Sequence, residues 1–129
     1  MNALEPQQPT LEGEVEVEIH EHVRTAIVTL RGEHDLTTRG HLAAVLAKAG
    51  EHPRVLVDLS ECTFVDSSVI SALVVAHTHV VQRDGRLEVV VPTGASTARR
   101  IVELTRLGEI MPIQSMRTGL GPNAGWDAA

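Results

Sequence analysis

The chain has 129 residues, which is enough for one domain with a real hydrophobic core between loose ends. Hydrophobic residues make up an ordinary 43% of it, but only 2% are aromatic, so aliphatic side chains must fill the core. The formal net charge of −6, the lack of a basic tract and the scarcity of aromatic rings argue against a protein that binds nucleic acid directly. An acidic domain of this composition is better suited to binding another protein.

The compartment expected from the sequence is the cytoplasm. Residues 1–18 carry acidic residues and prolines, where a secretory signal needs basic residues and an apolar core. No apolar run approaches the roughly 20 residues that span a bilayer, so we expect no membrane association. Cys62 is the only cysteine, which leaves no internal disulfide and no cysteine-rich metal site.

The first part of the chain predicts a flexible arm followed by a β-hairpin. Residues 1–13 contain two prolines and two glutamines, a composition typical of a flexible N-terminal arm. Glu14–Ile19 alternates strictly between acidic and apolar residues, as a half-buried strand does. A polar stretch separates it from a second strand predicted at Thr25–Leu30, and two such strands most simply form an antiparallel hairpin.

The middle of the chain predicts a loop, a helix and a buried strand. Arg31–Asp35 is the expected loop, and the helix after it begins at Thr37 or Thr38, whose hydroxyl can cap it. This helix ends at Ala49, where the following glycine supplies a stop. Val55–Leu59 has apolar residues on both faces, so we expect it at the centre of a sheet that helices cover.

The remaining elements predict an α/β fold. A loop at 60–67 leads to a helix from Ser68 to about Gln82, whose inner face is expected to hold Ile70, Leu73, Val74, His77 and Val81. A strand at 87–91, a helix from residue 96 or 97 to 107 and a short edge strand at 110–113 follow. This order predicts a single domain over residues 14–115, with a mixed β-sheet and helices packed against it. Residues 116–129 are expected to form a flexible C-terminal tail.

The junction between the buried strand and the second helix carries the most informative polar residues. Asp66, Ser67 and Ser68 stand at the point where a helix must begin. A helix start exposes unpaired N–H groups and the positive end of the backbone dipole, which suits both a short capping side chain and a phosphate group. Taken alone, these residues indicate an N-cap that stabilises the helix by about 1 kcal/mol.

Four motifs in order resemble the STAS domain, the fold of bacterial anti-sigma factor antagonists. The signature of that family is matched by Val57–Ser68, and its upstream Gly-Glu-(apolar)-Asp motif by Gly32–Leu36. Its following turn and strand resemble Asp84–Pro92, and its last helix resembles Arg99–Leu107. The similarity covers roughly residues 14–115, and four motifs in the right order are more specific than any one of them.

The resemblance implies a function in transcription regulation by partner switching. In that family, the first serine after the aspartate is phosphorylated by an anti-sigma factor that is itself a serine kinase. The unmodified antagonist binds this kinase and releases the sigma factor, and the phosphorylated form does not. Carried onto this chain, the phosphorylated residue is Ser67, with Ser68 as a minor candidate. The residues expected to contact the partner are His34, Asp35, Asp66, Ser67, Ser68 and Val69.

Two positions depart from the family pattern. Val69 stands where the family usually has a glycine directly after its serine pair, and His34 replaces the usual apolar residue of the loop motif. A β-branched residue at 69 is expected to narrow the docking surface or change the choice of partner. The alternative function is therefore a STAS adaptor subunit of a stress-signalling or lipid-transport complex, without phosphorylation of Ser67.

Other kinds of site find little support, and we expect no enzyme, cofactor or metal. The seven histidines match no strong zinc pattern. A hydrolase built on Ser67 lacks the Gly-x-Ser-x-Gly elbow, and no phosphate-binding Gly-x-x-x-x-Gly-Lys loop is present. Cys62 is expected to be a core or loop residue, and Trp126 a tail residue with docking as the alternative. The sequence leaves the oligomeric state open between a monomer and a weak dimer.

Overall fold

The structure is a computed structural model that describes residues 13–94 and 96–120. Within these residues it contains a five-stranded sheet with three α-helices. In chain order the elements are β1 (Glu14–His20), β2 (Thr25–His34), α1 (Leu36–Ala49), β3 (Arg54–Val65), α2 (Ser67–Gln82), β4 (Arg86–Val90), α3 (Thr97–Leu104) and β5 (Ile113–Gln114). Two short 3₁₀ turns, Glu21–Val23 and Leu107–Glu109, follow β1 and α3. The predicted α/β fold is confirmed.

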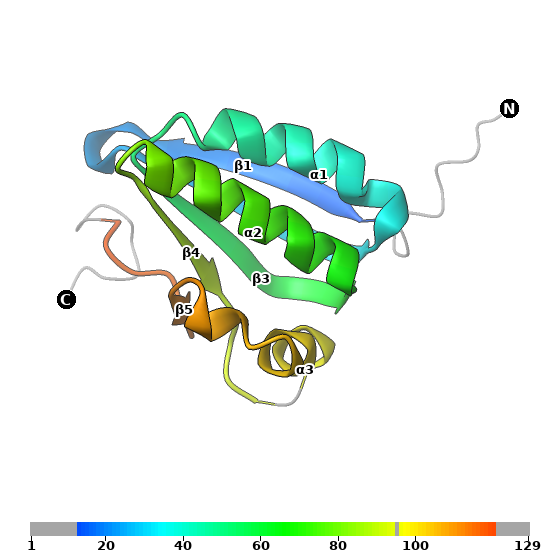
Figure 1. Ribbon diagram of the computed structural model, residues 1–129. Coiled ribbons are helices and arrows are strands. Elements are labelled where there is room, and N and C mark those ends of the chain that lie inside the picture. The colour runs from blue at the N-terminus through cyan, green and yellow to red at the C-terminus, as the bar shows by residue number, and fades with distance from the viewer. Residues whose placement is uncertain (1–12, 95, 121–129) are drawn as a thin grey trace, which may run out of the picture.

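The sheet has its strands in sequence order, β1-β2-β3-β4-β5. β1 pairs antiparallel with β2, which confirms the predicted hairpin, and every later pair is parallel. Parallel neighbours need a crossover, and α1 and α2 supply the first two. Figure 1 shows these two helices side by side across one face of the sheet, with α3 below α2 and in contact with β3.

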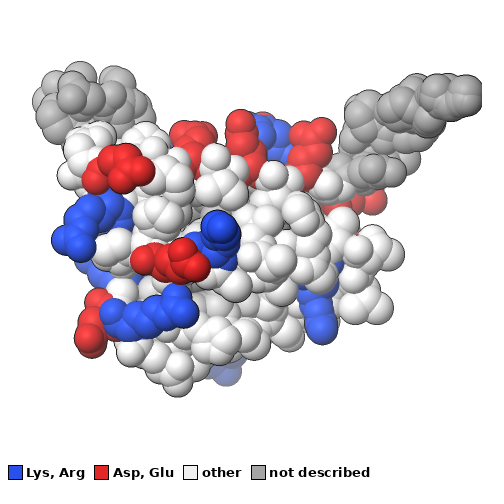
Figure 2. Space-filling view, turned by 90° about the horizontal axis from the view of Figure 1, so that it is seen from above, with Lys and Arg blue, Asp and Glu red and all other residues white. Residues whose placement is uncertain are grey.

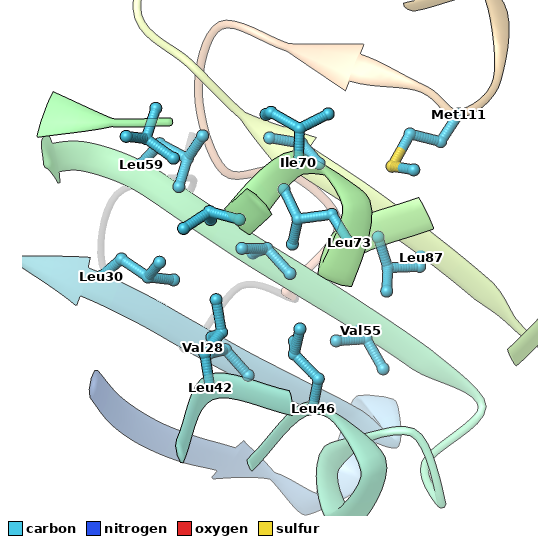
Figure 3. Close-up of a cluster of buried hydrophobic side chains, with 14 of the residues drawn as sticks. Val28, Leu30, Leu42, Leu46, Val55, Leu59, Ile70, Leu73, Leu87 and Met111 are labelled. Atoms are coloured by element: carbon cyan, nitrogen blue, oxygen red, sulfur yellow. The ribbon is translucent and has the colours of Figure 1, made fainter. Parts of the chain in front are cut away.

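The main core lies between the sheet and the helices. Alternate residues of the central strands point to this side, including Val28, Leu30, Val55 and Leu59, and they meet Leu42 and Leu46 of α1 and Ile70 and Leu73 of α2 (Figure 3). All of these side chains are aliphatic, as the shortage of aromatic residues requires. On α2 the residue packed inward near the C-terminal end is Val80, which is 1% exposed, and not the predicted Val81, which is 49% exposed.

The opposite face of the sheet is covered by the segment after β5. Leu120 is buried there against Ile27, Leu56 and Val90. Arg117 Nε donates to Asp58 Oδ2 over 2.6 Å, and Asp58 is only 5% exposed. The sequence predicted a flexible tail from residue 116, and the structure places Arg117 and Leu120 of that stretch against the sheet, because glycines and a missing periodicity do not reveal such long-range contacts. The rest of that tail, with Trp126, lies outside the described residues.

β2 and β3 extend beyond their predicted ends, and this extension changes the surroundings of the candidate site. Residues 31–34 pair with residues 61–65, so the stretches predicted as loops form a continuation of the sheet. The register shifts twice in this part, and Gly32 adopts a φ of +78°, a conformation that suits glycine.

The last helix, α3, is shorter than predicted. Leu104, its last residue, is 67% exposed, and Leu107 is buried in the turn that follows.

Candidate functional site

The candidate site lies where β2 and β3 end side by side and the helices α1 and α2 begin. His34 and Val65 are register partners at the ends of these strands, and one residue separates each strand from its helix. Those two residues are Asp35 and Asp66. The main-chain N–H of Asp66 donates to the carbonyl oxygen of His34, with an N···O distance of 3.3 Å. The structure thus brings together the two motifs that the sequence keeps about thirty residues apart, and Figure 1 shows both helix starts at the same end of the molecule.

Asp66 is the N-cap of α2. Its backbone is extended, and its Oδ1 accepts hydrogen bonds from the N–H groups of Ser68 and Val69, at 3.0 and 3.3 Å. These bonds satisfy two of the four N–H groups that a helix start leaves without an intrahelical partner. Of the three residues that the sequence offered as the N-cap, Asp66 is the cap, and Ser67 is already the first residue of the helix, one position before the predicted start.

The two serines differ in what their hydroxyl groups do. Ser68 is half-buried, and its Oγ donates to Asp66 Oδ1 over 2.6 Å. Ser67 is exposed, and within the described residues its hydroxyl makes no hydrogen bond. Of the two hydroxyl groups, that of Ser67 is therefore the more accessible. The hydroxyl of Ser68 is already hydrogen-bonded to the carboxylate of Asp66, the N-cap.

Asp35 repeats this arrangement at the start of α1. Its Oδ1 accepts from the N–H of Thr37 at 2.9 Å and from the Thr37 hydroxyl at 2.6 Å, and Thr38 completes a capping box with the main-chain N–H of Asp35. The hydroxyl and N–H of Thr37 hold the pKa of the Asp35 carboxyl below its ordinary value of 3.8. Asp35 is half-exposed, so an ionised carboxylate stands on the surface beside the start of α2.

His34 is a structural residue beneath this surface. Its side chain is fully buried, with Nδ1 3.2 Å from the Thr38 hydroxyl and Nε2 3.1 and 3.2 Å from the carbonyl oxygens of Arg31 and Glu14. The prediction that it contacts the partner is not supported by this position, because a docked protein cannot reach the ring. A polar residue looked like a surface residue in the sequence, but in the interior two carbonyl oxygens at Nε2 and a hydroxyl at Nδ1 give both ring nitrogens a hydrogen-bond partner.

Val69 also lies beneath the surface. Its side chain is 0% exposed and packs in the main core. In this conformation a partner docked on the site meets Ser67 and the backbone around it, and does not meet the valine side chain. The expectation that a β-branched residue here narrows the docking surface is therefore not supported by the geometry.

Two exposed apolar side chains flank the site, and sequence reasoning missed both. Leu36 follows Asp35 directly and is 66% exposed, and Phe64, the only phenylalanine, is 40% exposed two residues before Asp66. Two features of the sequence could have indicated these residues. One is an apolar leucine directly after the loop aspartate, and the other is an aromatic residue in a protein that is otherwise almost entirely aliphatic. Apolar side chains beside two carboxylates and a hydroxyl make a surface suited to a protein partner.

Other kinds of site are not evident in the described part of the chain. No group of three or more histidine, cysteine, aspartate or glutamate side chains is placed to hold a metal ion among the described residues. Cys62 is buried, and burial raises the pKa of its thiol to about 11, so it is poorly suited to act as a nucleophile. None of the helices within residues 13–94 and 96–120 is long and apolar enough to cross a membrane.

Comparison with known proteins agrees with this geometry. Residues 17–114 match the family described as "Mlab, STAS domain", and a comparison with curated proteins gave no match. The crystal structure of an anti-sigma factor antagonist from Mycobacterium paratuberculosis is similar, with 25% identity and a TM-score of 0.71 over 81% of this chain and 87% of that one.

Two more distant structures share the fold. A STAS-domain protein from Planctomyces limnophilus has 19% identity and a TM-score of 0.66, covering 80% of this chain and 91% of its own. The Bacillus cell fate determinant SpoIIAA in its phosphorylated form has 18% identity and a TM-score of 0.58, covering 79% and 92%. With the family match spanning most of the sequence, the chain belongs to the STAS-domain family, as its four motifs predicted.

Proposed function

We propose that this protein is an anti-sigma factor antagonist. In its unmodified form it binds an anti-sigma factor that is a serine kinase, and the sigma factor is released. Phosphorylation of Ser67 by that kinase ends the binding. The protein acts by binding and not by turnover, and its expected compartment is the cytoplasm.

The observation that carries the proposal is the state of the Ser67 hydroxyl. It is exposed at the first position of α2, while the neighbouring Ser68 hydroxyl is bonded to Asp66. Asp35 and the apolar Leu36 lie at the adjacent helix start. One modifiable group thus lies within a surface that has the mixed character of a protein interface.

Electrostatics explains how one phosphate could act as a switch. A phosphoserine carries about −1.5 to −2 charges at pH 7. The folded domain tolerates this charge because it lies at a helix N-terminus, where the dipole is positive. A partner docked there would meet a third negative group beside the carboxylates of Asp35 and Asp66. The complex is lost while the domain stays folded.

Similarity supports the same proposal. The Mycobacterium paratuberculosis structure is titled an anti-sigma factor antagonist, and the SpoIIAA structure is titled a phosphorylated form. The same fold therefore carries a phosphorylated state in another protein.

A direct test uses the anti-sigma factor kinases encoded in the same genome. Each is incubated with the protein and ATP, and the modified residue is located by mass spectrometry. We expect modification at residue 67, its loss in Ser67→Ala and its retention in Ser68→Ala. Calorimetric titration should then show a complex with the wild type that Ser67→Glu abolishes. Binding by a cognate kinase without any modification of Ser67, or equal binding by Ser67→Glu, would refute the switch.

A second candidate is a STAS adaptor subunit that is never phosphorylated. The family description that matches this chain names Mlab, and Val69 departs from the glycine of the antagonist pattern. If this candidate is right, the protein copurifies in a stable complex whose composition is the same for wild type and Ser67→Glu.

A further inference from the structure

An open groove runs between α1 and α2 on the outer side of the helical layer. Its volume is about 350 Å³, and most of its lining side chains are small or apolar, with a few polar ones among them. The lining residues are Arg39, Ala43, Leu46, Ala47, Ser71, Ala72, Val75, Ala76 and His79. Val75 is 55% exposed at its centre, so the described residues leave the groove open.

Charge distinguishes this face from the rest of the molecule. The chain has 17 aspartates and glutamates, yet α1 and α2 contain none of them. The two helices instead carry Arg39 and Lys48. In Figure 2, acidic and basic side chains gather along the upper edge and at the left of the view, and the lower middle of the view is mostly uncharged. An acidic protein with net charge −6 thus has no carboxylate within either of these two helices, and Asp35 and Asp66 lie only at their starts.

The shape of the groove fits a helix. Ala43 and Ala47 stand one turn apart on α1, and Ala72 and Ala76 stand one turn apart on α2. Small residues at this spacing let a third helix come close to both, so that its side chains fill the space between the two ridges. Val75 then provides an apolar contact near the centre of such an interface.

We propose that this groove docks an amphipathic helix of the partner, with an apolar inner face and acidic residues along its flanks. The inference rests on the proposed function, because the partner meant here is the anti-sigma factor that also contacts Ser67. Arg39 at the rim pairs with a carboxylate of the docked helix. The occupant is acidic because a basic helix would find no carboxylate on α1 or α2.

The groove and the phosphorylation site are continuous. Ser71, which lines the groove, follows Ser67 by one helical turn on α2. A phosphate on Ser67 therefore adds negative charge at the end of a groove that receives an acidic segment. This placement gives the modification a second route to weaken the complex, through repulsion of the flanks of the docked helix.

Matched substitutions on α2 test the proposal. Val75 and Val81 are both exposed valines of the same helix, at 55% and 49%, but only Val75 lines the groove. Calorimetric titration with the anti-sigma factor kinase that modifies Ser67 should show at least about tenfold weaker binding for Val75→Glu and little change for Val81→Glu. Circular dichroism should show that both variants melt like the wild type.

Substitutions that change the charge of Arg39 test whether the docked helix is acidic or only apolar. Arg39→Glu should weaken the same complex, and Arg39→Ala should reduce its dependence on salt, because the proposed ion pair is screened. Arg100→Glu, on the exposed side of α3, is the matched control.

The outcomes separate this inference from the proposed function. If a kinase binds and Ser67→Glu abolishes the complex, but Val75→Glu and Arg39→Glu bind like the wild type, the groove proposal is wrong and the switch survives. If no anti-sigma factor kinase binds at all, both fail. If sedimentation velocity shows a dimer that Val75→Glu dissociates, a second copy of the chain occupies the groove and the acidic-helix proposal is overturned.

Discussion

The main-chain N–H of Asp66 donates a hydrogen bond to the carbonyl oxygen of His34 over 3.3 Å. Together with the pairing of β2 and β3, this bond links the starts of α1 and α2, because His34 precedes the cap of one helix and Asp66 is the cap of the other. The buried ring of His34 holds its own end of the bond through Thr38. The candidate site is therefore built on two rigid helix starts, which is the arrangement that a specific docking surface needs.

Replacing Asp66 and Ser67 by alanine should separate a structural role from a functional one. Asp66→Ala removes the acceptor of the Ser68 and Val69 N–H groups, so it should lower the free energy of unfolding by about 1 kcal/mol. Ser67→Ala removes an exposed hydroxyl and should change this free energy by less than about 0.5 kcal/mol. Urea denaturation followed by circular dichroism measures both. A large loss for Ser67→Ala would show that the serine is part of the cap.

The carboxylate of Asp35 should make stability depend on pH in the acid range. Bonds from Thr37 lower its pKa below 3.8 in the folded state, so the unfolded chain takes up the proton first as the pH falls. The contribution of Asp35 to stability is therefore complete above its ordinary pKa and is lost as the pH falls through the lower, folded value.

This dependence can be measured as the difference between two proteins. Unfolding free energies of the wild type and Asp35→Asn are compared from neutral pH to about pH 2. We expect the gap to be largest at neutral pH and to shrink below pH 4, approximately where unfolded aspartate titrates. Glu33→Gln removes an exposed carboxylate near the end of β2, two residues before Asp35, and serves as the control. A gap that widens toward low pH would contradict the prediction.

The ion pair between Arg117 and Asp58 should hold the last described segment on the sheet. Arg117 also donates from Nη2 to the Thr29 hydroxyl at 3.0 Å, and its partner Asp58 is buried. Arg117→Met keeps much of the side-chain volume but leaves the Asp58 carboxylate without its cation, so we expect a loss of roughly 2–3 kcal/mol in urea denaturation.

A second substitution shows whether that loss comes from the stranded charge. Asp58→Asn in the Arg117→Met background should recover part of the stability, because the amide has no charge to leave unpaired. Hydrogen exchange should be faster around Leu120 in Arg117→Met than in the wild type. Unchanged stability and exchange in Arg117→Met would show that this segment does not depend on the pair.

The fold could be predicted from the sequence where local pattern and burial agree. Strict alternation in Glu14–Ile19 and the apolar run Val55–Leu59 each leave one reasonable structure, and both are strands in the sheet. The residues that follow the predicted strands of β2 and β3 were harder to assign. The continuation of β2 is polar and that of β3 mixes polar with apolar residues, and the two become strand by pairing with each other, as Gly32 does with Cys62. Such pairing is a long-range property that a local pattern cannot contain.

The candidate site was predictable in its residues but not in their roles. The resemblance located Asp35, Asp66 and Ser67, and the structure brings their two loops together. The resemblance could not show that the side chains of His34 and Val69 are buried, because a motif identifies positions in the sequence but not their exposure to solvent. The resemblance also did not predict the groove between α1 and α2. Each helix lacks carboxylates, but the two form one surface only after they pack side by side.

Cys62 should react slowly in the folded protein. Its side chain is 7% exposed, its Sγ lies 3.2 Å from the carbonyl oxygen of Phe64, and burial raises its pKa to about 11. At pH 8 very little thiolate is present, and reagents reach it only when the structure opens. Labelling with a chromogenic disulfide reagent should be at least about tenfold slower in the native protein than in urea. Native labelling should also accelerate in Asp66→Ala, because weakening the start of α2 favours opening of the adjacent end of β3. Equal rates in native and unfolded protein would show that Cys62 is accessible and available for chemistry.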